Sequence, residues 1–512
     1  MSDETSTAKR PGWILELTVF VCGAVVMAYE INGSRILAPF IGTSTYIWTS
    51  LIGVILGALS IGYWFGGRMA DREPNIRILA SAIFAAASLI SFTILIKDIV
   101  LQAISQFPGG VEIRSIIAAV LLFAPASIAL GFVIPYATKL RIADLKESGS
   151  IVGRLYALST VGSIVGTFAA GFFLIPFVGS VRTLYLIAAV LFVLSILIAG
   201  FSFTRNSITA VIVFVLGIGV SEGSSYLLWR TNSLHDIDTE YSRVWIFETT
   251  KPDSGQKMVA MATDPVYIQS ARYLESDELA LEYTKFYDLI RAYRPDFKRT
   301  LMIGGAGFSY PQAYLTKYPN AEIDVVEIDP GMTKIARRFF TLKDDPRLQI
   351  FHADGRVFLN SAQTASYNSI LMDAFGSLFS VPFQLTTIEA VREMHRVLDE
   401  NGVVIFNIGS AITGDAGLFL HSEVATYKQV FGEVHLYKVR PDAADSVSQN
   451  LMIVACKSAC PDVDSDDFIS SDPELAAMLT KRIDSSHALS IPILTDELAP
   501  VERFASIAHS LR

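Results

Sequence analysis

The chain has 512 residues, of which 51% are hydrophobic and only 18% charged, and its mean hydropathy is +0.43. That balance is not typical of a water-soluble protein of this size, and the length leaves room for two or more domains. Residues 1–230 contain 15 Lys and Arg against 11 Asp and Glu, whereas the remainder contains 26 against 39. The net charge of −9 therefore arises in the C-terminal half, and this acidic balance argues against a nucleic-acid partner.

Apolar runs long enough to cross a bilayer, which takes about 20 residues, fill the N-terminal half. They lie near residues 13–31, 46–66, 76–96, 115–137, 155–177, 183–203 and 207–228. The first run lacks a small-residue cleavage site and six more follow, so a cleaved signal peptide is not expected. The pattern predicts an α-helical polytopic membrane domain over residues 1–230, with about seven transmembrane helices and with residues 32–45 as a re-entrant or interfacial piece. Gly162 and Gly166 form a small-xxx-small pair, which predicts close packing against a neighbouring helix.

The orientation of this domain follows from its basic loops. Lys and Arg cluster before the first run and in the second and fourth loops, and the positive-inside rule places these segments in the cytoplasm. An odd number of spans then leaves the C-terminal half outside, whereas six or eight spans leave it inside. We therefore predict a multi-pass protein of the cell (inner) membrane, with the lipid bilayer as a partner and the side of the soluble half left open.

Cysteine and histidine usage predicts neither a disulfide framework nor a metal site. The chain has three cysteines. Cys22 lies in an apolar run, and Cys456 and Cys460 could pair in an oxidising compartment, but we expect free thiols. The seven histidines include no HExxH motif, no close pair and no nearby cysteine set, so no metal is expected.

The composition changes after Arg230. Residues 241–263 alternate like antiparallel strands around a turn that contains Gly255, which predicts a small β-rich entry module over residues 231–280. A helix is expected over residues 277–291. Strands then alternate with helices, the strands lying near 300–304, 322–328, 348–352, 368–373, 402–408, 432–437 and 449–455. Residues 281–512 are thus predicted to form an α/β Rossmann-like domain of the class I methyltransferase type, with a largely parallel seven-stranded sheet.

Residues 301–329 contain the strongest ligand signal in the chain. A buried strand is followed by a turn with Gly304, Gly305 and Gly307, then by a helix and a second strand that carries Glu327 near its end. Glycines allow close approach of a ligand, and a carboxylate in this place can bind ribose hydroxyls. The glycine spacing is not GxGxxG, which favours an adenosine ligand without a pyrophosphate, such as a relative of S-adenosylmethionine. An unliganded Rossmann-like sheet is the alternative.

Six motifs carry a resemblance to a known family. They are YIQSARYLESDEL (267–279), IGGAG (303–307), VVEIDP (325–330), HADGRVFL (352–359), ILMDAF (370–375) and LTDELAPVE (494–502). They occur in the order found in spermidine synthases, and the chain most closely resembles the membrane-fused spermidine-synthase-like proteins. YEINGSRILAPFIGTS (29–44), GGRMADR (66–72) and GRLYALSTVGSIVGT (153–167) are similar to the membrane domain of that subgroup, so the resemblance covers nearly the whole chain.

The resemblance implies a binding site for decarboxylated S-adenosylmethionine or S-adenosylmethionine, with no metal. Glu327 is then expected to bind the ribose hydroxyls, and Asp354 with Gly355 to meet the adenine. Gly304 and Gly305 are expected to let the backbone approach the tail of the donor.

The resemblance also places Asp373 in the family's catalytic position and Gln269 near the sulfonium side of the donor. An amine attacks the methylene next to the sulfonium and expels methylthioadenosine, so the enzyme must align the nitrogen and keep it unprotonated. A carboxylate bonded to the amine can accept the proton, and Asp373 suits this role. A carboxylate that only caps the loop after its strand is the alternative.

Three departures from the family pattern concern recognition of a cationic amine. Gly307 and Gly376 stand where the family usually has aspartates, and the gatekeeping tyrosine and its neighbour align near Leu281 and Glu282. Glu282 or Tyr283 could compensate as substrate-binding residues. Each missing charge-assisted hydrogen bond is worth about 1.5–3 kcal/mol. The departures therefore argue against putrescine as the acceptor and against decarboxylated S-adenosylmethionine as the donor.

The leading prediction is a membrane-anchored transferase that moves an aminopropyl or related alkyl group to a small-molecule amine. A methyltransferase on the same sheet is one alternative, and its product would be S-adenosylhomocysteine instead of methylthioadenosine. The other alternative is a transporter or sensor that binds a nucleoside or polyamine without turnover. Because spermidine synthases are commonly dimeric, a homodimer is a further expectation from the resemblance.

Overall fold

The structure is a computed structural model that describes residues 12–142, 148–199, 234–264, 267–374, 381–463, 472–484 and 493–510, with residue 491 and a few positions between 212 and 219. The chain divides into two compact units, Met1–Leu228 and Trp229–Arg512. Each unit has its own core and is described by itself.

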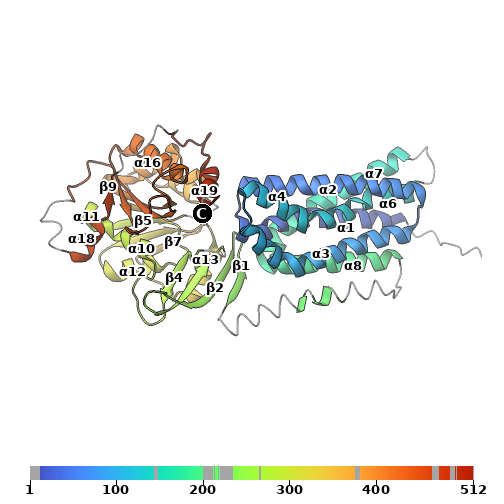
Figure 1. Cartoon of the computed structure of the whole chain (residues 1–512), viewed down its shortest axis with the longest axis horizontal. Coiled ribbons are helices and arrows are strands. Elements are labelled where there is room, and N and C mark those ends of the chain that lie inside the picture. The colour runs from blue at the N-terminus through green and yellow to red at the C-terminus, as the bar shows by residue number, and fades with distance from the viewer. Residues whose placement is uncertain are drawn as a thin grey trace, which may run out of the picture. The chain divides into compact units, whose positions relative to one another are not determined.

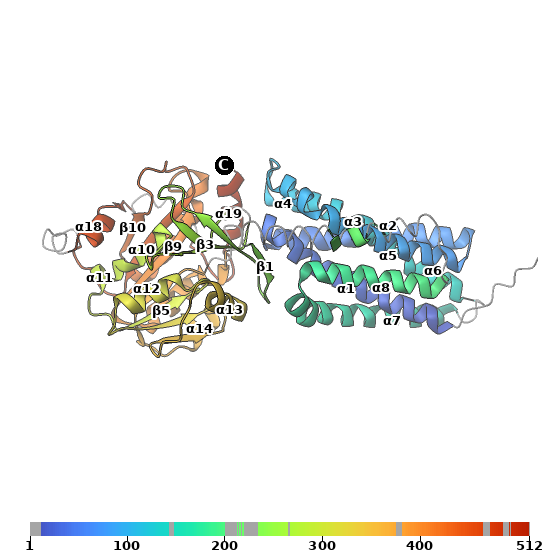
Figure 2. The ribbon, with the colours of Figure 1, turned by 90° about the horizontal axis from the view of Figure 1, so that it is seen from below.

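The first unit is a bundle of apolar helices (Figures 1 and 2). Its described helices are α1 (Gly12–Ile41), α2 (Thr45–Arg72), α3 (Ile76–Ser105), α4 (Val111–Leu122), α5 (Ala124–Gly131), α6 (Val133–Arg141), α7 (Ser148–Ala169), the π-helix η2 (Ala170–Val178) and α8 (Ser180–Ala199). Five helices in the described part are long and apolar enough to cross a membrane. The number is six if α4 and the following helical stretch Ala124–Arg141, which are bent by 52° relative to each other, count as one span. These match the first six predicted runs, and the seventh run, 207–228, lies mostly outside the described residues.

The prediction of a re-entrant piece over residues 32–45 is wrong for most of its length. Helix α1 continues without a break to Ile41, and α2 begins at Thr45. Ile36, Leu37 and Ile41 recur at helical spacing and are buried, so the helix extends to keep them packed. The amide nitrogen of Asn32 donates to the Ser180 carbonyl oxygen at 2.9 Å, whereas its amide oxygen has no hydrogen-bond partner among the described residues.

The predicted close approach at the glycine pair of α7 is confirmed. A Cβ built on Gly162 would lie 2.1 Å from the carbonyl oxygen of Phe20, and one built on Gly166 would lie 2.0 Å from that of Ala24. Both carbonyls belong to α1, so any larger residue at either position would separate the two helices.

The second unit begins with the predicted antiparallel module. Its four strands, in the order β1-β2-β3-β4, are β1 (His235–Asp238), β2 (Arg243–Thr250), β3 (Lys257–Ala262) and β4 (Ser270–Tyr273). The turn between β2 and β3 contains Gly255 at φ +68°, a conformation that glycine adopts without strain.

The predicted continuous helix over residues 277–291 is wrong. Residues up to Leu281 do not form a helix, because Leu279 forms a bridge with Arg272 of β4. Three short helical turns then follow, namely α10 (Glu282–Lys285), the 3-10 helix η3 (Phe286–Leu289) and α11 (Ile290–Tyr293). A bridge to the strand immediately before the helical run therefore overrides the apolar periodicity at its start.

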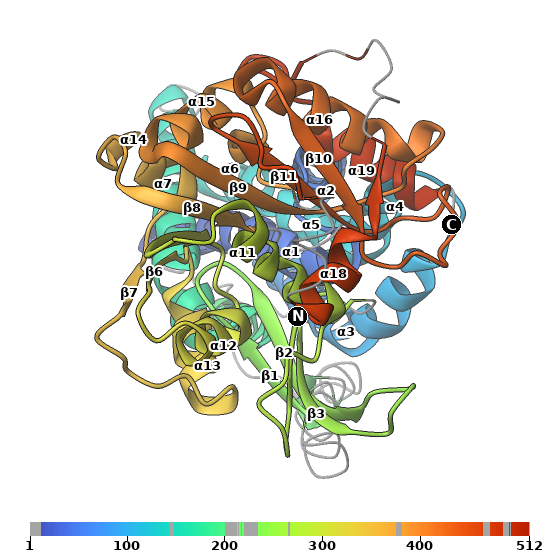
Figure 3. The ribbon, with the colours of Figure 1, turned by 90° about the vertical axis from the view of Figure 1, so that its left-hand side faces the viewer.

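An eight-stranded mixed sheet forms the centre of the second unit (Figure 3). Its order is β12-β10-β11-β9-β8-β5-β6-β7, with β5 (Arg299–Ile303), β6 (Glu322–Val326), β7 (Leu348–Phe351), β8 (Tyr367–Met372), β9 (Leu398–Ser410), β10 (Val434–Lys438), β11 (Gln449–Cys456) and β12 (Arg482–Ile483). All seven predicted strands are present, and β12 is additional. Strands β7, β6, β5, β8 and β9 are parallel, whereas β11, β10 and β12 pair antiparallel, so this is a Rossmann-type sheet with an antiparallel edge.

Helices cover this sheet, and a hydrophobic core lies on each face. The helices are α12 (Ser309–Lys317), α13 (Pro330–Phe339), α14 (Gly355–Ser361), α15 (Ile388–Val397), α16 (Leu418–Phe431), α18 (Pro473–Leu479) and α19 (Val501–Ser510). Alternate residues of one strand enter opposite cores. In β5, Leu301 and Ile303 belong to one core and Met302 to the other. The parallel strands thus end at one edge of the sheet, where their following loops meet.

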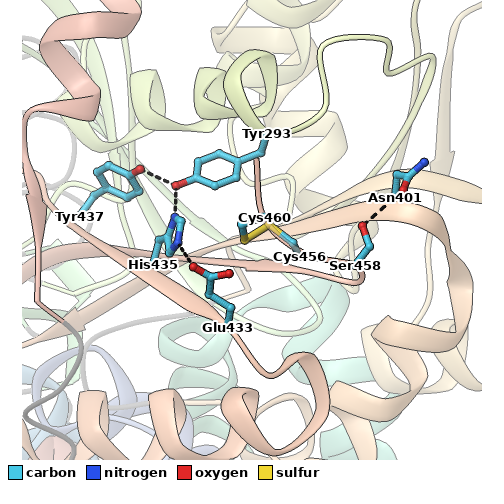
Figure 4. The surroundings of a disulfide bond; sticks show 8 residues. All are labelled: Tyr293, Asn401, Glu433, His435, Tyr437, Cys456, Ser458 and Cys460. Carbon is cyan, nitrogen blue, oxygen red and sulfur yellow. Dashed lines mark hydrogen bonds and ion pairs between the residues drawn. A yellow bond between two sulfur atoms is a disulfide. The ribbon is translucent and has the colours of Figure 1, made fainter. Parts of the chain in front are cut away.

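The expectation of free thiols at Cys456 and Cys460 is wrong, because the structure joins them in a disulfide (Figure 4). Cys456 ends β11, and the chain turns back so that the two Cα atoms lie 5.4 Å apart. Ligand atoms of Glu433, His435 and Cys460 lie within 4.8 Å of one another. The Cys460 sulfur is bonded to Cys456, so in this state it does not offer a thiolate to a metal.

Glu423 is a buried acidic residue of α16, and its substitution should change the stability of the protein. Its side chain has no exposed surface, neither carboxylate oxygen has a hydrogen-bond partner among the described residues, and burial raises its pKa well above the ordinary value. The native state then holds the proton to higher pH than the unfolded chain, so stability falls as pH rises. We expect Glu423→Gln to increase the free energy of unfolding by on the order of 1–3 kcal/mol at pH 8 and to change it little at pH 4. Thermal unfolding in detergent at both pH values checks this, and an equal change at both would contradict it.

Candidate functional site

The glycine turn after β5 brings the backbone close to the end of β8. Gly304 has φ +96°, and its N–H donates to the Val326 carbonyl oxygen at 2.9 Å. A Cβ at this position would lie 2.2 Å from the carbonyl oxygen of Asp373. Both the left-handed backbone and the close approach therefore require glycine here.

Glu327, directly after β6, binds this turn. The side chain is only 7% exposed, and its carboxylate accepts the N–H groups of Gly305, Ala306 and Asp329, each at 2.9 Å. Burial raises the pKa of Glu327, and these three hydrogen bonds oppose that rise. A carboxylate has about four acceptor positions, so one remains for a ligand hydroxyl. Glu327 thus has a structural role in addition to the one predicted for it.

Asp354 also has two uses. It precedes α14 as its N-cap, where one carboxylate oxygen accepts the N–H groups of Arg356 at 2.8 Å and Val357 at 3.1 Å. The other oxygen accepts from the amide nitrogen of Gln384 at 3.4 Å. The cap orients the carboxylate toward the edge of the sheet, beside Gly355.

These loops enclose a cavity of about 130 Å³, termed here the first cavity. Of the predicted donor-binding residues, those that line it are Gln269, Gly304, Glu327, Asp354 and Gly355. Gly305 does not line it, and it acts through its N–H bond to Glu327. Tyr241, Ser242 and Gln384 also line the first cavity and were not predicted.

Asp373 lies just beyond β8 and is held by two side chains. The Tyr283 hydroxyl donates to its Oδ2 at 3.1 Å, and the Asn407 amide nitrogen donates to its Oδ1 at 3.0 Å. The Asn407 amide oxygen in turn accepts from the Asn450 amide nitrogen at 3.0 Å. Burial raises the pKa of Asp373 to about 6, although the bonds from Asn407 and Tyr283 lower it. A carboxyl group with this pKa is mostly ionised at neutral pH and can accept a proton.

A second cavity of about 410 Å³ opens on the other side of Asp373. It shares Gln269, Ala306 and Asp373 with the first cavity. Its further polar lining residues include Asp264, Glu282, Tyr283, Asn407, Arg440, Gln449 and Asn450. Asp373 therefore stands at the junction of a small cavity, lined by Gly304, Glu327 and Asp354, and a larger one with mixed polar walls.

Comparison with known proteins agrees with this geometry. Residues 290–457 match the spermine/spermidine synthase domain. A polyamine aminopropyltransferase of Vibrio vulnificus is 33% identical over 233 residues, which cover 45% of this chain and 75% of that protein. The chain belongs to the polyamine aminopropyltransferase family.

Two further similarities describe the extent of the relationship. Polyamine aminopropyltransferase 1 of Streptomyces coelicolor is 22% identical over 436 residues, covering 78% of this chain and 76% of that protein, so the aminopropyltransferase match extends into the first unit. A probable spermidine synthase from Corynebacterium glutamicum, known as a crystal structure, is 21% identical with a TM-score of 0.44, covering 52% of this chain and 96% of that one.

The two predicted substrate-binding residues, Glu282 and Tyr283, lie in different surroundings in this aminopropyltransferase. Tyr283 lies against Asp373. Glu282 pairs with Lys251 at 3.2 Å and Lys285 at 3.1 Å, and its side chain is 51% exposed. Its charge is thus already neutralised by two lysines, which makes Glu282 a poor receptor for a cationic amine.

The structure also explains one departure from the aminopropyltransferase pattern. A Cβ built on Gly307 would lie 2.8 Å from the Ser270 Cβ and 3.0 Å from the Phe340 ring. The Gly307 N–H donates to the Ser270 hydroxyl at 3.1 Å. The turn therefore has no room for the aspartate usual at this position. Gly376 lies outside the described residues.

Residues that sequence reasoning missed come chiefly from β9 and the ends of β10 and β11. Asn407 is the polar residue within the apolar run VVIFNI (403–408), a signal that could have identified it. Arg440, Gln449 and Asn450 have no such local signal. They reach the second cavity only because β10 and β11 pair beside β9.

Proposed function

We propose that this protein transfers an aminopropyl or related alkyl group from an S-adenosylmethionine-type donor to an amine and releases methylthioadenosine. The observation that carries the proposal is the position of Asp373 between two cavities. The first cavity suits the nucleoside, with Glu327 toward the ribose, Asp354 and Gly355 toward the adenine, and Gln269 toward the sulfonium. The second cavity then receives the amine.

The chemistry needs little beyond alignment and a proton acceptor. The amine lone pair forms a nitrogen–carbon bond to the methylene next to the sulfonium, while the carbon–sulfur bond breaks and its electron pair stays on the sulfur. The amine proton passes to the Asp373 carboxylate. The bonds from Tyr283 and Asn407 hold that carboxylate in one orientation, which favours an in-line approach.

Mass spectrometry of detergent-purified protein tests the proposal directly. The protein is given decarboxylated or intact S-adenosylmethionine together with a panel of amines. Methylthioadenosine and an amine-dependent product support the proposed transfer. S-adenosylhomocysteine would instead indicate a methyltransferase, and binding without any product would indicate a sensor or transporter. The family relationship does not favour these two alternatives.

Substitution of Asn407 is expected to move the pH profile. Asn407→Leu removes a hydrogen bond that lowers the pKa of Asp373, so this pKa rises further above its wild-type value of about 6. Because only the ionised carboxylate accepts a proton, the acid limb of kcat moves to higher pH, to roughly pH 7 for the loss of one such bond. Initial rates between pH 5 and 9 measure this. An unchanged acid limb would show that Asp373 does not set the profile.

We also propose that the first unit anchors the enzyme in the cell (inner) membrane as a multi-pass protein. Five described helices meet the length and hydropathy needed, and Phe172, Phe173 and Phe177 of η2 are each more than 60% exposed. We expect the chain to remain in the membrane fraction after alkaline carbonate extraction, and release into the supernatant would contradict this. Labelling of cysteines introduced at surface positions, applied from each side, then assigns the side of the second unit.

A further inference from the structure

Gln449 is a buried polar residue in the lining of the second cavity. It begins β11, is 4% exposed and lines the cavity. Neither its amide oxygen nor its amide nitrogen has a hydrogen-bond partner among the described residues. A buried donor or acceptor left unpaired costs about 1–3 kcal/mol. An amide nitrogen that donates and an amide oxygen that accepts are thus both left unsatisfied at this wall of the cavity.

Arg440 lies across the ladder from Gln449. Lys438 of β10 pairs with Leu451 of β11, and the Val439 N–H donates to the Asn450 carbonyl oxygen at 3.4 Å. Continuing this antiparallel register by one residue sets Arg440 opposite Gln449, and Arg440 also lines the second cavity. The exposed Arg440 therefore adds a cationic side chain to the same wall of the cavity as Gln449, so a second ammonium group of a simple diamine bound there would meet like charge.

Three acidic residues of the described part line the second cavity together with Gln449 and Arg440, namely Asp264, Glu282 and Asp373. Asp373 is needed at the junction for the reacting nitrogen, and Glu282 is neutralised by Lys251 and Lys285. Asp264, which is 3% exposed and accepts the Tyr267 N–H at 2.8 Å, supplies a further carboxylate to the lining. The cavity therefore offers groups of both signs in addition to an amide that both donates and accepts.

Taking the proposed transfer as its basis, we propose that the acceptor carries an α-amino acid head at the end away from the reacting amine. Its carboxylate accepts from the Gln449 amide nitrogen and from Arg440, and its α-ammonium donates to the Gln449 amide oxygen. A lone ammonium satisfies only the oxygen, and a lone carboxylate satisfies only the nitrogen. The terminal amine at the other end attacks the donor methylene, the carbon–sulfur bond breaks toward sulfur, and Asp373 receives the proton.

Three probes of matched chain length separate these cases. Ornithine (2,5-diaminopentanoate) differs from 1,4-diaminobutane only by a carboxylate on the carbon that bears the far amine, and 5-aminopentanoate lacks only the α-ammonium. With the full-length protein in detergent, we expect kcat/KM for ornithine to exceed that for either other probe by at least about tenfold, since one charge-assisted bond is worth that much. A preference for 1,4-diaminobutane would overturn the proposal.

Two variants test the residues themselves. Gln449→Glu keeps the shape and removes the donor, so the preference is expected to reverse toward 1,4-diaminobutane. Arg440→Gln is expected to reduce kcat/KM for ornithine by about tenfold and to raise the value for 1,4-diaminobutane, because the like charge is removed. Arg392→Gln, an exposed charge change on α15, serves as the matched control and should change neither value. If neither cavity variant alters the order of the three probes, the proposal is wrong.

The proposed transfer and this inference can fail separately. Release of methylthioadenosine with any amine supports the transfer, whichever probe is preferred. If no amine gives product, the transfer fails, and binding of the three probes in the presence of methylthioadenosine then decides the inference by thermal shift. Stabilisation by ornithine that is larger than that by 1,4-diaminobutane and is lost in Gln449→Glu supports the inference, and equal shifts overturn it.

Discussion

Asp373→Asn is expected to reduce kcat by about 10²–10⁴-fold, the usual contribution of a positioned proton acceptor. The amide cannot take the proton that the wild-type carboxylate, with its pKa raised to about 6 by burial, is able to accept. The new amide nitrogen also faces one of the two donors, from Tyr283 or Asn407, that the carboxylate bonded. Initial rates of methylthioadenosine release measure the loss.

The binding of methylthioadenosine to the same variant distinguishes chemistry from folding. Asp373 belongs to both cavities, but the contacts predicted for ribose and adenine come from Glu327, Asp354 and Gly355. We therefore expect the Kd by calorimetry to change less than about threefold. Asp296→Asn removes a charge from an exposed carboxylate of the same unit and is the matched control. Wild-type turnover in Asp373→Asn would remove Asp373 from the mechanism.

Glu327→Gln is expected to weaken methylthioadenosine binding by about 10–100-fold and to lower stability by about 1–3 kcal/mol. The wild-type carboxylate accepts three backbone N–H groups. A glutamine side chain has one acceptor oxygen, and its NH₂ group is directed at one of those donors, so the glycine turn loses support and the ribose loses its acceptor.

Calorimetry and thermal unfolding measure the two effects of Glu327→Gln on the same preparation. Glu322→Gln is the matched control, because Glu322 is an exposed residue at the other end of the same strand, β6. Burial raises the pKa of Glu327, so its carboxylate becomes protonated at a higher pH than an exposed glutamate would. As the pH is lowered, nucleoside binding should therefore begin to weaken at that higher pH. A variant that is destabilised but binds normally would leave Glu327 with a structural role alone.

Local patterning in the sequence was sufficient for much of this protein. The seven strands between residues 299 and 456, the first six apolar runs and the glycine turn at Gly304 all appear where their spacing predicts them. These features depend on residues close together in the chain, because hydrophobic period and glycine content act over one strand or one turn. The motif order also led to the family, since four of the six motifs lie at the carboxyl ends of the parallel strands β5, β6, β7 and β8.

The tertiary structure decided whatever depends on residues far apart in the chain. Two differences are local in sequence but still depend on the path of the backbone. The bridge between Leu279 and Arg272 interrupts the expected helix, and the turn after β11 joins Cys456 to Cys460. Tyr283 meets Asp373 across 90 positions of sequence. The second cavity depends likewise on the pairing of β9, β10 and β11, which places Gln449 and Arg440 on one wall. Burial and charge at such a wall are properties of packed neighbours, and no window of the sequence contains them.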